Sequence, residues 1–123
     1  MFKLKNILLV IALIAVIGVS QTAYSAEQLL KAAQIAKILQ GNTAYLSNGA
    51  TQSFFKDGRT LYLSANGSLE HGSWNTQGDK YCSQWSGRWS CYDMTGDGKQ
   101  AITWTQGTTK YPARMVSGIH LNQ

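Results

Sequence analysis

The stretch GSWNTQGDKYCSQWSGRWSCYD, residues 72–93, contains both cysteines of the 123-residue chain and three of its four tryptophans. If Ser86-Gly87 forms a two-residue hairpin loop, the flanking strands pair so that Cys82 lies opposite Cys91. Counted from the loop, this is a pair without mutual backbone hydrogen bonds, where Cα atoms lie about 4.5 Å apart. That separation suits a disulfide. The stretch therefore predicts a hairpin whose register is specified by a Cys82–Cys91 disulfide.

Two other roles for the cysteines fit the sequence less well. A zinc site needs about four ligands, and the only histidines are His71 and His120, neither at zinc-finger spacing. A redox pair is typically Cys-x-x-Cys, whereas residues 83–90 separate these two cysteines. We therefore predict a structural disulfide, no metal site and no cofactor.

The same register divides the hairpin side chains between two faces. One face is richer in apolar groups, and it carries Tyr81, Ser83, Trp85, Arg88, Ser90, Tyr92 and Met94. We expect Tyr81, Tyr92 and Met94 on this face to point into the core, because the other face places Lys80 opposite Asp93 and suits water. Trp89 then lies over the disulfide on the outside. Elsewhere in the chain, Trp74 and Trp104 are expected in the core.

Turn signals recur on both sides of this hairpin at near-regular intervals. They are Asn48-Gly49, Asp57-Gly58, Asn66-Gly67, Gln77-Gly78-Asp79, Ser86-Gly87, Gly96-Asp97-Gly98 and Gln106-Gly107. Such dipeptides supply the positive φ angles of tight turns, and short aromatic and β-branched runs lie between them. Spacings of roughly 9 to 11 residues fit an antiparallel meander. The sequence therefore predicts a mainly β domain of seven or eight strands, curled into a small barrel that removes exposed edges.

One helix is expected before the strands. In residues 27–40, EQLLKAAQIAKILQ, apolar residues recur at helical spacing and Gly41 follows as a stop signal. An amphipathic helix of this kind can bind a membrane surface or a partner. We favour a helix that packs across the domain it precedes.

The first residues have the features of a secretory signal peptide. Lys3 and Lys5 precede the apolar run of residues 7–19, and small residues follow it, so we predict a signal peptide over residues 1–25 with cleavage after Ser25. The apolar run is too short for a strong membrane anchor, because a spanning helix needs about 20 residues. We expect a periplasmic or secreted protein, a single domain over residues 26–123 and no stable membrane insertion.

The charge balance argues against nucleic acid as a partner. The chain has 11 basic and 6 acidic residues, and removal of Lys3 and Lys5 leaves 9 against 6, a net charge near +3. That is a mildly basic surface without the concentrated charge of a nucleic-acid-binding protein.

Few residues suggest catalysis. Glu70-His71 is the only adjacent pair of an acid and an imidazole, and a two-residue turn at Asn66-Gly67 would place Glu70 opposite Leu63, facing inward. We favour instead a bulge near Gly72 that leaves Glu70 in water. The spacing of Asp93 and Asp97 lacks the alternating ligands of a calcium loop. We therefore predict a protein that is not an enzyme.

Several short motifs resemble a group of small secreted Gram-negative bacterial proteins of unknown function. Their common pattern is a short helix, a Gly-Asn-Thr-like segment and then G-x-W…G-x-x-Y-C…W…C-Y…D-G. The matching positions are Gly72, Trp74, Gly78, Tyr81, Cys82, Trp85, Cys91, Tyr92, Asp97 and Gly98. The resemblance implies a lipocalin-like β domain with a disulfide. It implies no known reaction and no catalytic residues.

Two binding functions follow from this reading. In the favoured one, the outer surface around Trp85, Arg88 and Trp89 binds a macromolecule, an envelope protein or a glycan, because Trp and Arg are enriched in interface hot spots. In the alternative, the barrel mouth holds a small apolar or aromatic ligand. A filled core with Trp85 or Trp89 exposed would favour the first. An apolar cavity above roughly 300 Å³ would favour the second.

Overall fold

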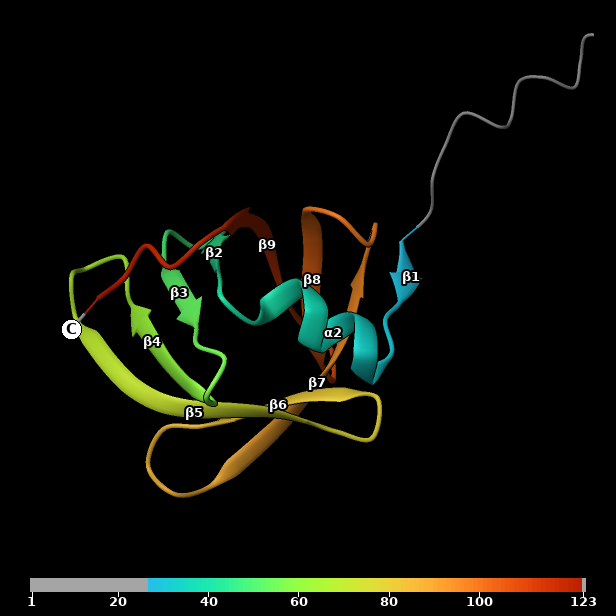
Figure 1. Cartoon of the computed structure of the whole chain (residues 1–123), viewed down its shortest axis with the longest axis horizontal. Coiled ribbons are helices and arrows are strands. Elements are labelled where there is room, and N and C mark those ends of the chain that lie inside the picture. Colours follow the sequence, from blue (N-terminus) through green and yellow to red (C-terminus); the bar gives the residue numbers. More distant parts are fainter. Residues whose placement is uncertain (1–26, 123) are drawn as a thin grey trace, which may run out of the picture.

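Eight antiparallel strands follow one another along the chain and close into a barrel. The computed structural model describes residues 27–122 (Figure 1); the predicted signal peptide, residues 1–25, lies outside the described residues. The barrel strands are β2 (Asn42–Leu46), β3 (Thr51–Phe54), β4 (Arg59–Leu63), β5 (Leu69–Gln77), β6 (Lys80–Gln84), β7 (Trp89–Gly96), β8 (Ala101–Gln106) and β9 (Thr109–Ser117). Each pairs with its neighbour in sequence, and β9 pairs with β2 to close the barrel. The predicted barrel-like meander is confirmed.

The predicted helix over residues 27–40 is too long. The helix, α2, is Ala32–Leu39, and it is preceded by a two-residue strand, β1 (Gln28–Leu29), which pairs with the end of β7. The Leu30 amide donates to the carbonyl oxygen of Met94 on β7, and the Ala32 amide donates to Asp79 Oδ1 at 2.9 Å. These long-range bonds hold the first residues extended, so the helix begins later than its apolar spacing predicts.

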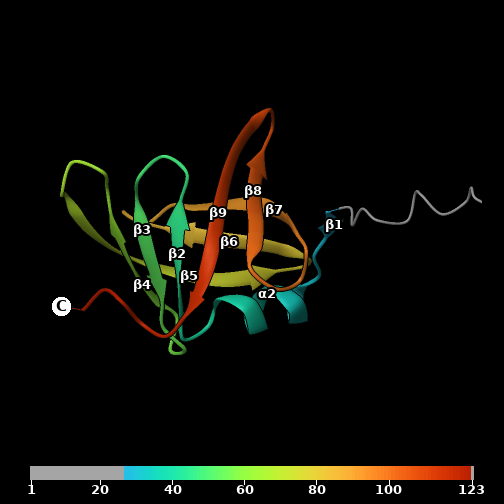
Figure 2. The same cartoon turned by 90° about the horizontal axis from the view of Figure 1, so that it is seen from above.

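Helix α2 lies across one end of the barrel (Figures 1 and 2). Its apolar face contributes Ile35 and Leu39, both fully buried, and it contacts β2, β5 and β6. The loops at the opposite end are residues 47–50, 64–68, 85–88 and 107–108. Because the helix covers one end only, these four loops surround an end of the barrel that α2 does not cover.

The core beneath α2 is built from inward-facing residues of nearly every strand. Its buried members include Ala44, Phe54, Trp74, Tyr81, Met94, Ile102, Trp104 and Met115. The rings of Trp74, Tyr81 and Trp104 each lie 5.8–6.0 Å from the Phe54 ring, measured between centroids. The expectation that Trp74 and Trp104 are core residues is therefore confirmed.

The central hairpin, β6 and β7, has the predicted register. Cys82 pairs with Cys91, their Cα atoms are 4.0 Å apart, and the two form the disulfide. Tyr81 and Met94 are buried and Tyr92 is partly buried on the inner face, as expected. The strands end at Gln84 and Trp89, so the loop is longer than the predicted Ser86-Gly87 pair, but the longer loop leaves the pairing unchanged.

Candidate functional site

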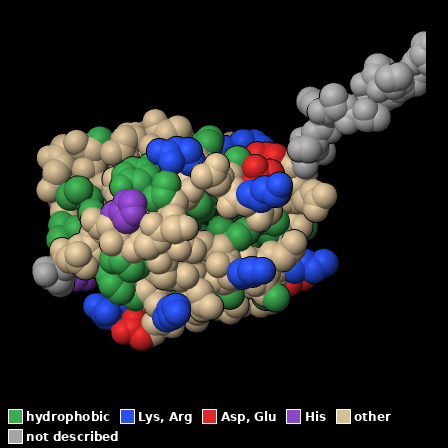
Figure 3. Space-filling view, turned by 45° about the horizontal axis from the view of Figure 1, so that its top comes forward, with side chains coloured by type: hydrophobic (Ala, Val, Ile, Leu, Met, Phe, Trp, Pro, Cys, Tyr) green, Lys and Arg blue, Asp and Glu red, His purple; other side chains and the backbone are tan. Residues whose placement is uncertain are grey.

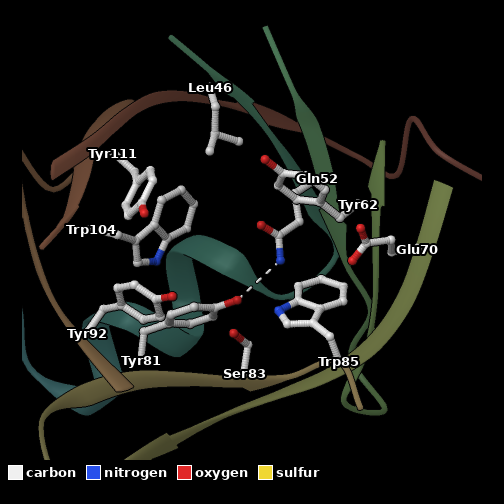
Figure 4. Close-up of a pocket in the computed structure, with 10 residues that line it drawn as sticks. All are labelled: Leu46, Gln52, Tyr62, Glu70, Tyr81, Ser83, Trp85, Tyr92, Trp104 and Tyr111. Atoms are coloured by element: carbon white, nitrogen blue, oxygen red, sulfur yellow. Dashed lines mark hydrogen bonds between the residues drawn. The ribbon is translucent and has the colours of Figure 1, made fainter. Parts of the chain in front are cut away.

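A pocket of about 210 Å³ lies inside the barrel on the side away from α2. Figure 4 looks into it, with α2 behind the lining side chains. The lining is mostly aromatic: Leu46, Gln52, Tyr62, Glu70, Tyr81, Ser83, Trp85, Tyr92, Trp104 and Tyr111. Nine of the ten lie in strands and share the inner face by alternation and cross-strand pairing, and Trp85 follows directly after β6. Glu70 is the only charged residue among them.

Hydrogen bonds at the pocket floor join side chains of β3, β4 and β6. Gln52 Nε2 donates to Tyr81 Oη at 3.2 Å and to Thr60 Oγ1 at 3.0 Å. Burial raises the pKa of Tyr81 far above its ordinary value, so this phenol stays protonated and remains able to donate. Burial also raises the pKa of Tyr92, with smaller contributions from Tyr111 and Tyr62. The floor therefore offers neutral hydrogen-bonding groups among aromatic rings.

The indole nitrogen of Trp104 is the exception to this hydrogen bonding. Trp104 is 4% exposed, and its Nε1 has no hydrogen-bond partner in the described part of the chain. By contrast, Trp74 Nε1 donates to the carbonyl oxygen of Phe55 at 3.0 Å. Buried polar groups nearly always have partners, so the Trp104 N–H is an unusual feature of the barrel interior.

Glu70 lies on the inner face at the pocket and is exposed there, although the pairing and the bulge from which its position was predicted are both absent. The β4–β5 loop is residues 64–68, so Leu63 pairs with Leu69 and Glu70 pairs with Tyr62. The predicted pairing of Glu70 with Leu63 is wrong, and the pairing runs from Leu69 to Ser73 without a bulge near Gly72. Glu70 is nevertheless exposed, because it lies near the loop end of β5.

The predicted surface residues do not share one face. Trp85 lines the pocket and its ring lies 5.8 Å from that of Tyr62, whereas Trp89 is on the outer face of β7 and is 38% exposed. Arg88 is exposed in the loop between them. His71 pairs with Leu61 on the face opposite Glu70, so Glu70 and His71 do not form an acid–base pair.

Gly72 provides the space into which Trp85 fits. A Cβ atom at this position would lie 2.5 Å from the Trp85 ring and 2.5 Å from the carbonyl oxygen of Gln84. The Trp85 ring therefore packs directly on the backbone of β5, and any side chain at residue 72 would displace it.

Replacing Gly72 by alanine should lower the free energy of unfolding by about 1–3 kcal/mol, the usual cost of overpacking. Trp85 should also shift, changing the tryptophan emission of the folded protein. Urea unfolding and fluorescence measure both effects. Ser73→Ala, on the opposite face of the same strand, is the control and should have little effect. An unaltered emission spectrum and midpoint in Gly72→Ala would contradict the packing described.

Comparison with protein-family models, with curated proteins and with solved structures finds no match to this chain. No helix in residues 27–122 has the length and apolar character needed to cross a membrane. Within the same residues, no three His, Cys, Asp or Glu side chains gather in a way that could bind a metal ion.

Sequence reasoning missed four of the ten pocket-lining residues: Leu46, Gln52, Tyr62 and Tyr111. Gln52, Tyr62 and Tyr111 come from three strands, and alternation within each strand limits every one of them to one of two faces. Which face is inward depends on the register of β3, β4 and β9 in the closed barrel. The aromatic content of the strands was the available signal, and it suggested a core without showing that one end stays open.

Proposed function

We propose that this protein is a non-catalytic binding domain that holds a small ring-containing molecule in the mouth of its barrel. The observation that carries the proposal is the open space of about 210 Å³ on the side of the barrel away from α2, which is walled mostly by aromatic side chains. Aromatic walls with a few polar groups are typical of sites for small molecules.

The size of the pocket limits the ligand to about one ring. Its volume of about 210 Å³ is below the roughly 300 Å³ at which sites for drug-sized ligands begin. It exceeds the about 150 Å³ of a cavity known to hold benzene. The volume therefore does not reach the size set for the predicted carrier of small apolar or aromatic ligands, and it supports a smaller ligand with a single aromatic or sugar-like ring.

The lining residues support binding over catalysis. They include one carboxylate and one serine, with no histidine, cysteine or lysine to act as a base or nucleophile beside them. A hydrolase or transferase needs such groups to converge on one reacting atom. Aromatic walls with a few neutral polar groups are instead typical of recognition sites.

In a titration with 4-methylphenol, the indole N–H signals of Trp104 and Trp85 should shift in ¹⁵N–¹H NMR spectra. Both rings line the pocket, so the ring current of the bound phenol should move both signals. Trp85→Ala removes one aromatic wall, so affinity should fall roughly fivefold, the value of a ring contact of about 1 kcal/mol.

Two tryptophans serve as controls for this titration. Trp74 already has an acceptor in Phe55, and Trp89 is on the outer face, so neither signal should follow the binding curve. Trp89→Ala should bind 4-methylphenol as the unmodified protein does. Shifts confined to Trp89, or no shift of any indole signal at millimolar phenol, would rule out the pocket as the site.

Macromolecular binding through the hairpin is the second proposal, and the exposure of Trp89 favours it. Trp89 and Arg88 are both accessible, and these residue types dominate interface hot spots. Trp85 no longer belongs to this surface, because it lines the pocket. Recovery of the same envelope proteins or glycans by the unmodified protein and by Trp89→Ala and Arg88→Ala would exclude this surface.

The disulfide supports a place of action outside the reducing cytoplasm. Disulfides persist in the bacterial periplasm and in secreted proteins, and Cys82 and Cys91 form one here. We therefore propose that binding takes place in the periplasm or outside the cell.

A further inference from the structure

Glu70 differs from the other acidic residues in having no partner. All six acidic residues of the chain lie within residues 27–122. Five of them form an ion pair or accept a hydrogen bond there: Glu27, Asp57, Asp79, Asp93 and Asp97. Glu70 forms neither kind of contact in the described residues, and it is the acidic residue that lines the pocket.

The surroundings of Glu70 are aromatic. Tyr62 is its cross-strand neighbour on the inner face, and the Trp85 ring meets the Tyr62 ring at 68°. Figure 4 shows the Glu70 carboxylate beside these two rings, on the wall opposite Trp104. Aromatic faces attract cations through their ring quadrupole, and a carboxylate adds a full negative charge. This corner of the pocket is therefore suited to an ammonium group.

Basic side chains outnumber acidic ones in the described residues as a whole. The described residues carry nine basic side chains against six acidic ones, and on the face seen in Figure 3 the Lys and Arg side chains are scattered over the surface. None of these basic residues lines the pocket. A positively charged ligand would thus find its negative partner at Glu70.

We infer that the ligand is a small aromatic amine, whose ring lies against the aromatic lining of the pocket and whose ammonium group contacts Glu70 beside Tyr62 and Trp85. The inference rests on the proposed function, because it names the ligand class of the same pocket. Glu70 lies on the wall opposite Trp104, so a single ring held between these walls would place an ammonium-bearing end at the carboxylate.

Three phenols that differ only in their end group test the inference. Tyramine ends in an ammonium, 2-(4-hydroxyphenyl)ethanol in a neutral hydroxyl and 3-(4-hydroxyphenyl)propionate in a carboxylate. Titration of the oxidised protein, followed by the indole N–H signals, should give tyramine about tenfold tighter binding than the alcohol, from the ion pair and the ring contacts together. The propionate should bind more weakly than the alcohol.

Glu70→Gln should lower the tyramine-to-alcohol affinity ratio to roughly two- to fivefold, because it removes the ion pair and keeps the contacts of the ammonium with the aromatic rings. Glu27→Gln is the matched control: it neutralises an acid that bonds to Thr95, away from the pocket lining, and should keep the ratio of the unmodified protein. Equal binding of all three phenols, or an unchanged ratio in Glu70→Gln, would overturn the inference while leaving the pocket as a ring-binding site. Failure of all three to bind would overturn the proposed function with it.

Discussion

Replacing Phe54 by alanine should lower the free energy of unfolding by about 3–5 kcal/mol, a large part of the stability of a small domain. Phe54 is completely buried, and its ring contacts Trp74, Tyr81 and Trp104 from three other strands. Truncation removes these contacts and leaves a cavity that rigid barrel walls fill poorly. Urea unfolding followed by circular dichroism measures the change.

The next residue provides the control for this experiment. Phe55 is partly buried, and the Arg59 guanidinium lies 4.3 Å from the centre of its ring. Phe55→Ala should cost much less, of the order of 0.5–1 kcal/mol for the cation–π contact plus some lost packing. If the two alanine variants were equally stable, the central place of Phe54 in the core would be wrong.

Reduction of the disulfide should lower the free energy of unfolding by about 2–3 kcal/mol. Cys82 and Cys91 are 9 residues apart in sequence, and closing a loop of this length restricts the unfolded chain by about that amount. The urea midpoint should then fall by roughly 1–2 M, given the usual dependence of stability on urea for a small domain. Parallel unfolding curves with and without dithiothreitol measure this shift.

The double variant Cys82→Ala/Cys91→Ala separates loss of the disulfide from other effects of the reductant. Its midpoint should match that of the reduced protein and should not respond to dithiothreitol. It should still fold, because β6 also pairs with β5 through five residue pairs. A midpoint in the oxidised protein no higher than in the variant would show that the disulfide contributes no stability.

Local turn chemistry explains why the central hairpin could be predicted. The register of β6 and β7 follows from the position of the loop, and the Cys82–Cys91 pair confirmed it. The same reasoning failed for β4 and β5. There the Ser64 and Asn66 side chains hydrogen-bond with Ser68 and hold a loop of residues 64–68 instead of a two-residue turn. The observed register of β4 and β5 differs from the predicted one by one residue. For this reason Leu61 lies on the outer face and Tyr62 lines the pocket.

The location of the candidate site depended on contacts between distant parts of the chain. Trp85 and Gly72 fit together only because β5 and β6 pair in one register. Because of this packing, Trp85 lines the pocket instead of lying on the predicted outer surface. The start of α2 depended on Asp79, far along the sequence. Neither contact leaves a periodic pattern in the sequence.

The sequence by itself determined the mainly β class, the approximate number of strands, the disulfide and the inner face of the central hairpin. These depend on short-range rules: alternation along a strand, positive φ angles at glycine turns and the span of a disulfide. Only the tertiary structure decided which end of the barrel α2 covers and that Trp104 and Glu70 face the same pocket. Alternation along a strand does not say which of its two faces points into the barrel. The pairing of β9 with β2 and the packing of α2 decide this for all strands together.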